Sequence, residues 1–564
     1  MSFLDYLFAV IPMLGVLIFV HELGHFLVAK WCGVRVLKFS LGFGAPIGFG
    51  NMRMRWVRGG TEYVIAWFPL GGFVKMLGEQ MQGVQGEEPD YVPDARPDEY
   101  LNAKSTMQKL AITFAGPVMN LILPVIAFMG VLAAGLPQRS PVIGTVEAHS
   151  PAAEVGLRAG DRIVAIGEEE VTSWDAIAMA IRDHSEAPMP LRVEREGDTE
   201  LFHVPVEQRS GMDEFGGVIE VGWIGVGHRR LPTLIGVPET TAPAALAGLQ
   251  SGDRIQRIGE TEVEDWEALV NAYGAELVGS QVAVRVERGT PPETEEVEFT
   301  IPVESDLAAL GLMPAAVLVR SVADEMPAKE AGFEPGDLIL AVDGDPIGSF
   351  ATFAEVVRTS GGRSLDITYA RGGETRTVAV APRERKVPGP FEITGMEQSV
   401  YQIGIAHGFP TLSGASHIET ILNPLVSIPK ATAMTIERAT LFLKSLGKLV
   451  SGDVGLENVS GPIGIAEVAR KSLDMGWLVY LNTMIFISIN LGFLNLLPIP
   501  ILDGGQAVII IVEGIKRSPI SLRSREIVQQ IGMTFILMLM GLAFWNDLSR
   551  HWGVFVEWLR GTGL

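Results

Sequence analysis

The seven residues VHELGHF, at positions 20–26, restrict the possible folds of this chain more than any other feature of its sequence. They lie inside an uninterrupted apolar run over residues 6–29, which is long enough to cross a bilayer because a spanning helix needs about 20 residues. Ionisable groups inside such a run carry a high free-energy cost and mark functional sites. His21, Glu22 and His25 therefore predict a functional site inside a membrane-spanning helix.

Three further segments, at residues 110–136, 477–500 and 527–545, have the same apolar character and sufficient length. No basic residue precedes the first run, so we expect a retained span rather than a cleaved secretory signal. The loop after the first run and the connection between the last two segments are both basic, and basic loops stay in the cytoplasm. The sequence thus predicts four spans, with both termini and residues 139–476 on the far side of the membrane.

The composition agrees with a mixture of membrane spans and soluble modules. The 564 residues are 48% hydrophobic and 20% charged, with a mean hydropathy of +0.28. Residues 139–400 hold 22 Lys and Arg against 45 Asp and Glu, so the net charge of −22 resides in this region. An acidic surface excludes nucleic acid as a partner, because phosphate binding needs a basic face. The single cysteine, Cys32, excludes an intramolecular disulfide framework.

An internal repeat occupies the acidic region. Residues 150–171, 242–263 and 326–347 align without gaps, and each copy combines a Pro-Ala start, a Gly-Asp turn and an aliphatic strand. The repeat resembles the PDZ domain of the bacterial periplasmic kind, which implies three α+β domains at residues 139–209, 230–304 and 313–384. Such domains bind extended peptides or chain ends by adding a strand to a sheet. A role as spacer or size filter stays open for each copy.

In the stretch that follows the third copy, from His417 to Gly452, apolar residues recur at helical spacing with polar residues between them. This pattern predicts amphipathic helices within residues 410–476, lying on membrane lipid at the outer surface. Residues 1–136 and 477–564 then form the two membrane portions.

The HExxH pattern predicts metal chemistry. Two histidines at i and i+4 share one helical face and can bind one metal ion, with Glu22 beside it as general base. A catalytic site needs a third protein ligand. Asp503, in NLLPIPILDGG at residues 495–505, ends the third span at the same predicted depth, near the cytoplasmic side.

HELGH in the first span and NxxPxPxLDGG near the end of the third resemble the site-2 protease family of intramembrane zinc metalloproteases. FSLGFGAPI (39–47), YVIAWFPLGGFVKMLGE (63–79), FAGPVMN (114–120) and VSGPIGIAE (459–467) are similar to the bacterial regulator of sigma-E branch. The resemblance implies that His21, His25 and Asp503 hold one Zn²⁺ and that Glu22 activates water. It also implies an inner-membrane location with the PDZ-like domains in the periplasm.

The same resemblance implies substrate-binding residues. Asn495 matches a position that engages the substrate or the oxyanion, although a hydrogen bond between helices is an alternative. Pro498 and Pro500 would shape the broken helix. The pieces 39–47 and 63–74, with Gly42, Gly44, Gly71 and Gly72, would re-enter the membrane as β-structure and offer a strand edge to an unwound substrate helix. The sequence departs from the family pattern in two places. It has three PDZ-like copies instead of two, and Gln506 stands where histidine is common.

The expected function is therefore cleavage of single-span membrane proteins, such as an anti-sigma factor already trimmed by another protease, or remnant signal peptides. A catalytically silent PDZ receptor and a metal transporter are the alternatives. The intact HExxH and Asp503 set disfavours the receptor, and the absence of repeated membrane halves in the sequence disfavours the transporter.

Overall fold

The computed structural model describes residues 3–48, 53–78, 92, 94–185, 187–213, 217–290, 293–388, 397–407, 412–452, 459–518 and 520–561. The chain divides into two compact units. The helical unit consists of Met1–Leu136, Pro388–Met396 and Thr420–Leu564, and the β unit consists of Pro137–Val387 and Glu397–Glu419. Parts of the predicted segments 1–136, 410–476 and 477–564 lie outside the described residues.

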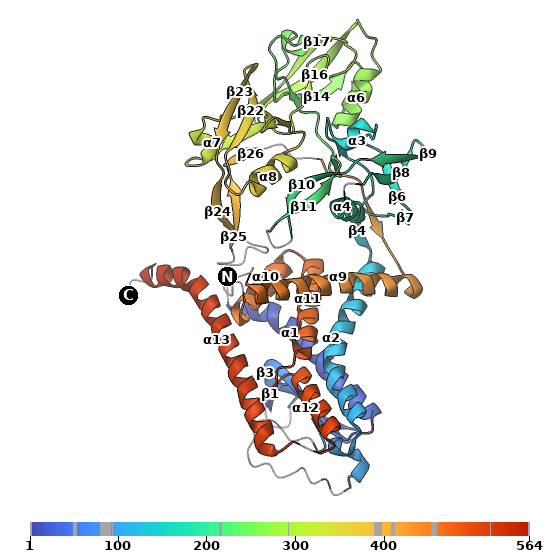
Figure 1. The fold of residues 1–564 in the computed structure, drawn as a ribbon, viewed down its shortest axis with the longest axis vertical. Helices are drawn as coiled ribbons and strands as arrows, with labels where there is room; N and C mark the ends of the chain where they lie inside the picture. Colours follow the sequence, from blue (N-terminus) through green and yellow to red (C-terminus); the bar gives the residue numbers. More distant parts are fainter. Residues whose placement is uncertain are drawn as a thin grey trace. The chain divides into compact units, whose positions relative to one another are not determined.

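The helical unit contains seven α-helices among its described residues (Figure 1). They are α1 (Phe3–Trp31), α2 (Thr106–Ala134), α9 (Pro424–Ser451), α10 (Pro462–Asp474), α11 (Trp477–Leu496), α12 (Asp503–Lys516) and α13 (Leu522–Gly561). Four stretches are long and apolar enough to cross a membrane: Asp5–Trp31, Thr106–Ala134, Trp477–Leu496 and Arg523–Ser549. The helix α2 packs against α1, α11 and α12, so it is the centre of this unit.

The third apolar segment ends earlier than the sequence predicted. Helix α11 stops at Leu496, and Asp503 does not end this span but opens the separate helix α12. The reason lies in Pro498 and Pro500, which have no N–H to donate and restrict the residues before them to extended backbone. The side-chain amide of Gln506 donates to the carbonyl of Pro500 at 3.2 Å, which ties the first turn of α12 to the break.

A small sheet accompanies these helices, built from β1 (Val36–Pro46), β2 (Arg55–Arg58) and β3 (Thr61–Met76). The long strand β3 folds back on itself. Its residues 62–65 pair with one side of β1, whereas residues 72–76 pair with the other side. The return run 72–76 is therefore an edge of the sheet, and β1 lies inside it. The sequence predicted β-structure in both pieces but not this order.

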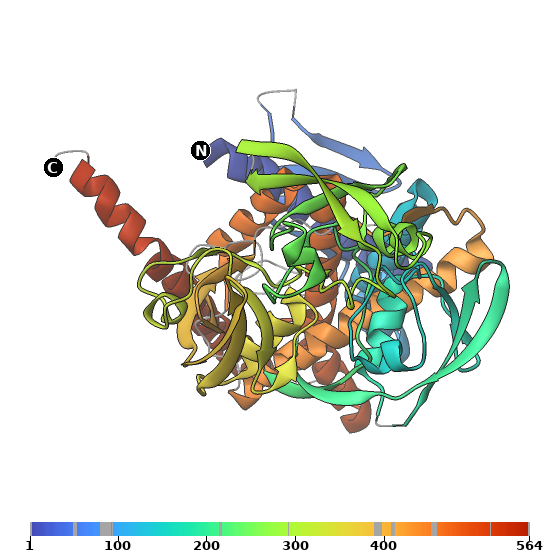
Figure 2. The same ribbon diagram turned by 90° about the horizontal axis from the view of Figure 1, so that it is seen from above.

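The β unit contains three copies of one four-stranded antiparallel sheet, coloured teal, lime and gold in Figures 1 and 2. The copies share one strand order, β7-β6-β8-β9, β15-β14-β16-β17 and β21-β20-β22-β23. Their bounds are β6 Arg162–Ile166, β7 Glu169–Glu170, β8 Met189–Arg195 and β9 Asp198–Val204; β14 Arg254–Ile258, β15 Thr261–Glu262, β16 Gln281–Thr290 and β17 Glu293–Pro302; β20 Leu338–Val342, β21 Asp345–Pro346, β22 Leu365–Arg371 and β23 Glu374–Val380.

Each copy also has a short helix that begins with proline and a longer helix after its second strand. These are α3 (Pro151–Glu154) and α4 (Trp174–Arg182), α5 (Pro243–Leu246) and α6 (Trp266–Gly274), and α7 (Pro327–Glu330) and α8 (Phe350–Thr359). The aspartate of every Gly-Asp turn is buried and forms an ion pair with an arginine near the end of the third strand. The pairs are Asp161–Arg195, Asp253–Arg288 and Asp337–Arg371.

One further strand completes each copy, and it follows the last residue that the sequence predicted for that copy. The pairs are β5 (Thr145–Val146) with β12 (Val226–Gly227), β13 (Ile235–Gly236) with β18 (Met313–Pro314), and β19 (Val319–Val322) with β26 (Ile405–His407). Three further pairs are β4 (Leu136–Arg139) with β27 (Ser416–Glu419), β10 (Glu207–Met212) with β11 (Val218–Trp223), and β24 (Arg383–Pro388) with β25 (Glu397–Gln402).

The predicted amphipathic helix starts later than expected. Residues Ser416–Glu419 form strand β27, which contradicts the helix predicted from His417 onward. Helix α9 begins at Pro424, and the side chain of Asn423 caps it by accepting from the N–H of Leu425 at 3.0 Å. Proline is favoured at a first helical position because its missing N–H has no partner there in any case.

Candidate metal centre

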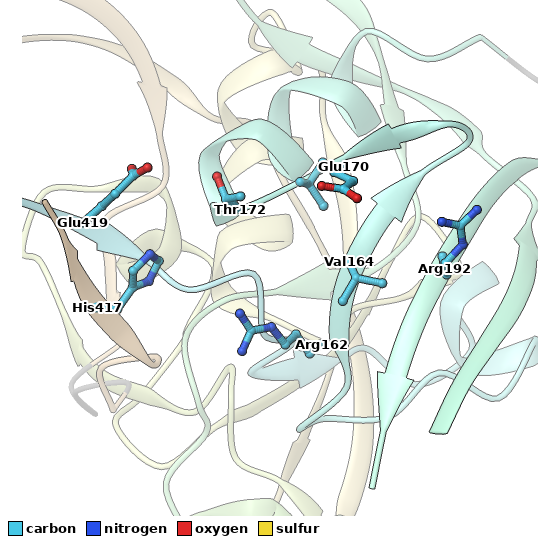
Figure 3. Close-up of a pocket in the computed structure, with 8 residues that line it drawn as sticks. Arg162, Val164, Glu170, Thr172, Arg192, His417 and Glu419 are labelled. Carbon is cyan, nitrogen blue, oxygen red and sulfur yellow. The ribbon is translucent and has the colours of Figure 1, made fainter. Parts of the chain in front are cut away.

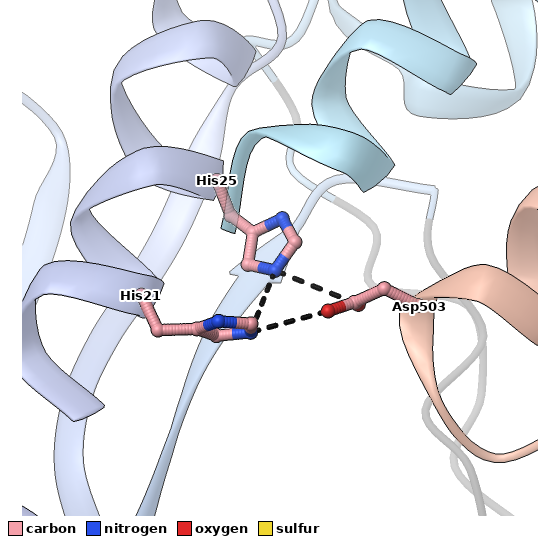
Figure 4. Close-up of side chains that lie close together, drawn as sticks. All are labelled: His21, His25 and Asp503. Atoms are coloured by element: carbon pink, nitrogen blue, oxygen red, sulfur yellow. Dashed lines mark hydrogen bonds and ion pairs between the residues drawn. The ribbon is translucent and has the colours of Figure 1, made fainter. Parts of the chain in front are cut away.

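Three predicted ligands from opposite ends of the chain converge in the helical unit. His21 and His25 lie one turn apart on α1, and Asp503 lies at the first position of α12 (Figure 4). The two Nε2 atoms are 3.3 Å apart. The Asp503 carboxylate oxygens lie 3.2 Å from Nε2 of His21 and 3.6 Å from Nε2 of His25.

These distances fit one zinc ion. Zinc binds imidazole nitrogen and carboxylate oxygen at about 2.0–2.2 Å, so two ligand atoms of a tetrahedron lie about 3.3 Å apart. The three measured separations, 3.3, 3.2 and 3.6 Å, surround that value. Two imidazoles and one carboxylate also form a donor set typical of catalytic zinc, with a fourth position left for water.

The second nitrogen of each imidazole ring contacts helix α2. Nδ1 of His25 lies 2.8 Å from the carbonyl oxygen of Ile112. A carbonyl can only accept, so Nδ1 carries the ring proton and Nε2 presents its lone pair toward Asp503 and His21. Nδ1 of His21 lies 3.2 Å from the side-chain amide of Asn120, which is fully buried.

Two glycines allow α1 and α2 to approach this closely. A Cβ on Gly24 would stand 2.3 Å from the carbonyl oxygen of Ala115, and one on Gly116 would stand 2.3 Å from Nε2 of His25. Sequence reasoning did not assign roles to Gly116 and Asn120, although both occur in the segment FAGPVMN. Their spacing, i and i+4, puts them on one face of α2, and that was the available signal.

Glu22 follows His21 on α1 and borders the small sheet. Its Cγ would lie 2.9 Å from a Cβ on Gly72, in the edge run of β3. The sheet therefore packs directly against the helix that carries the histidines, and a larger residue at position 72 would collide with Glu22.

The remaining predicted residues have separate positions. Asn495 is half-buried in the last turn of α11, and within the described residues its side chain forms no recorded hydrogen bond. Pro498 and Pro500 form the break before α12. Gly42 and Gly44 adopt positive φ in β1, and Gly71 lies against the ring of Phe43.

A cavity of about 450 Å³ in the β unit is chemically different (Figure 3). It is lined by Arg162, Val164, Glu170, Val171, Thr172, Arg192, His417 and Glu419. Its lining contains two arginines and two glutamates, so it presents no single charge to a ligand.

Comparison with known proteins identifies the family. The model of peptidase family M50 matches residues 9–539. This chain belongs to peptidase family M50. The regulator of sigma-E protease RseP of Escherichia coli is 32% identical over 98% of this chain and 100% of the relative. Protease RseP of Yersinia pestis is 30% identical with the same coverage of both chains.

Membership in family M50 makes this chain a zinc metalloprotease of the site-2 type. The relatives and the four apolar helices make it a multi-pass protein of the inner membrane. A PDZ domain protein from Parabacteroides distasonis covers 47% of this chain and 95% of its own length, at 10% identity and a TM-score of 0.11. A match with so low a TM-score carries no argument about the fold.

Proposed function

We propose that this M50 peptidase cleaves the transmembrane segments of single-span membrane proteins, with His21, His25 and Asp503 holding the zinc ion and Glu22 acting as general base. The observation that carries the proposal is the convergence of two imidazoles and one carboxylate, separated by 3.2–3.6 Å, beside Glu22 on a helix long enough to span a membrane.

Each residue has a distinct task in this reaction. When bound, zinc polarises the scissile carbonyl and lowers the pKa of its water toward neutrality. Glu22 accepts the proton of the attacking water and delivers it to the leaving nitrogen. His25 is held by Ile112 with its Nε2 lone pair directed at the site, so no reorientation is needed before the reaction.

The edge run 72–76 of β3 is the proposed place for the substrate. The peptide bonds of a transmembrane helix are shielded by the helix itself, so cleavage requires local unwinding, and the freed N–H and C=O groups then need partners. An exposed strand edge supplies such partners. Gly72 in this run contacts Glu22, so a strand bound along the edge would lie close to the general base. Asn495, Gly42, Gly44 and Gly71 remain candidates for further substrate contacts, and Pro498 and Pro500 for shaping the site.

The proposed substrates are an anti-sigma factor after a first cleavage and remnant signal peptides. The proposed orientation places both termini and the β unit in the periplasm and the metal centre near the cytoplasmic side. The three copies of the β unit would then act as PDZ-like domains, binding peptides or chain ends and excluding substrates with bulky periplasmic domains. The amphipathic α9 would contact lipid: Leu425, Ile436 and Leu443 are exposed along it.

The test compares wild type, Glu22→Gln and Asp503→Ala, purified in detergent, for bound zinc and for cleavage of a single-span substrate with a short periplasmic tail. Wild type should bind one zinc ion and cleave, Glu22→Gln should retain zinc without cleaving, and Asp503→Ala should lose zinc. Glu437→Gln, an exposed change on α9, serves as the control and should behave as wild type. Cleavage by Glu22→Gln at the wild-type rate would refute the assignment of the base.

A further inference from the structure

Asn120 lies at the junction of three helices next to the metal centre. Its side chain faces Nδ1 of His21 on α1, and its backbone carbonyl accepts from the hydroxyl of Ser488 on α11 at 2.7 Å. Asn120 is fully buried, at 0% exposure. The hydrogen bond from Ser488 holds the backbone of Asn120 against α11, so only the side-chain amide can rotate.

The two histidines differ in what holds their outer nitrogen. His25 contacts a carbonyl, which can only accept a hydrogen bond. His21 contacts an amide, which has a donor and an acceptor that exchange places when the group rotates by half a turn. The protonated nitrogen of His25 is thus fixed by its partner, whereas that of His21 depends on the direction of the Asn120 amide.

The Asn120 amide is placed with its nitrogen toward His21, and its oxygen has no hydrogen-bond partner among the described residues. Nδ2 of Asn120 faces Nδ1 of His21, so Nδ1 accepts and the ring proton is on Nε2, where it can donate to Asp503 at 3.2 Å. The amide oxygen, Oδ1, is buried. A buried acceptor without a hydrogen bond costs about 1–3 kcal/mol of stability, so this direction of the amide is unfavourable.

Metal binding reverses these requirements. A histidine that binds metal through Nε2 has its proton on Nδ1, and this proton almost always has an acceptor. We propose that Asn120 is a positioning residue of the metal site, whose Oδ1 accepts from Nδ1 of His21 in the metal-bound protein. The inference rests on the proposed metal site and adds to it the residue that selects the binding form of His21.

The experiment measures the zinc dissociation constant of the full chain in detergent by competition with a chromophoric chelator, and the visible spectrum of the Co²⁺-loaded protein. Asn120→Leu keeps the branched shape of the side chain but has no acceptor, so it should weaken zinc binding about 10- to 100-fold and change the Co²⁺ spectrum. Asn120→Asp retains the acceptor and should stay within about threefold of wild type. Thr483→Val, a buried change on α11 away from the ring, is the matched control and should leave zinc binding unchanged.

Equal zinc affinity in wild type and folded Asn120→Leu would overturn this inference and leave the proposed function intact. Wild type that takes up no zinc would overturn both. If Asn120→Leu does not fold, judged by its melting temperature, Asn120→Asp decides: affinity near wild type supports the acceptor role, and a loss of tenfold or more contradicts it.

Discussion

Gly116 on α2 lies so close to His25 on α1 that a Cβ at position 116 would stand 2.3 Å from Nε2 of His25 and 2.8 Å from Nε2 of His21. A carbon and a nitrogen atom that are not bonded to each other cannot lie 2.3 Å apart, so one of them must move. Gly116→Ala should therefore move a ligand and weaken zinc binding by about tenfold or more, measured by chelator competition.

Gly130 gives the matched control for this change, since it lies on the same helix and a Cβ there meets nothing within 4 Å. Gly130→Ala should leave zinc affinity unchanged and raise the free energy of unfolding by about 0.5–1 kcal/mol. Equal zinc affinities for the two alanine variants would contradict the close approach of α2 to the site.

Asp547 on α13 caps helix α10 from a distance in sequence. Its carboxylate accepts from the N–H groups of Gly461, Ile463 and Gly464 at 3.0, 2.9 and 3.1 Å, and it is 1% exposed. Asp547→Ala leaves these donors without this acceptor, so the free energy of unfolding should fall by about 2–3 kcal/mol in denaturant titrations of the detergent-solubilised chain. Asp474→Ala, at the exposed end of the same helix, should change it by less than about 0.5 kcal/mol.

Asp337 is the buried carboxylate of the third copy in the β unit. It pairs with Arg371 and accepts from the N–H of Glu334 at 2.9 Å. Asp337→Ala should cost about 2–3 kcal/mol, because it removes a buried carboxylate that accepts from the guanidinium of Arg371 and from the N–H of Glu334. Hydrogen exchange should show faster exchange in the third copy alone, since the other two copies have their own pairs. Arg376→Ala, which removes an exposed pair with Glu374, should change stability by less than about 0.5 kcal/mol.

His228 in the β unit predicts a pH dependence of stability. Burial against Trp174 lowers the pKa of His228, and the neighbouring charges of Arg139 and Arg229 lower it further. The unfolded chain therefore binds this proton more readily than the folded chain. Stability should be greatest above about pH 6.5 and should fall as the pH decreases through that value toward the lower folded-state pKa.

Replacing His228 by Gln should make this decrease shallower. The measurement is the unfolding midpoint of the full chain between about pH 8 and pH 5.5, for wild type and variant. Identical slopes for the two proteins would show that this histidine does not contribute.

Several features of the structure were predictable from apolar runs, motif spacing and repeats in the sequence. The apolar runs indicated four helices, and the HExxH spacing put both histidines on one helical face. The predicted topology put Asp503 at the same depth as the histidines, and the structure brings its carboxylate to them. The three copies of the β unit followed from the ungapped repeat.

Other features depend on contacts between distant segments, which a single sequence does not reveal. Asn120 and Gly116 gain their roles only because α2 lies against α1. The return of β3 across β1 depends on sheet register, and a continuous apolar stretch gives no information on the side to which a strand pairs. The start of α12 at Asp503 could not be predicted, because a proline does not always end a helix. The two prolines before Asp503 do so, whereas Pro117 and Pro124 lie inside α2.

His21, His25 and Asp503 belong to the helical unit, although the β unit interrupts that unit between Leu136 and Pro388. The β unit is in this sense an insertion in the chain, between the two histidines and Asp503. Two separately synthesised polypeptides, one ending and one starting within the β unit, would each carry part of the ligand set. Neither polypeptide alone would hold all three ligands, so zinc binding would require the two to associate.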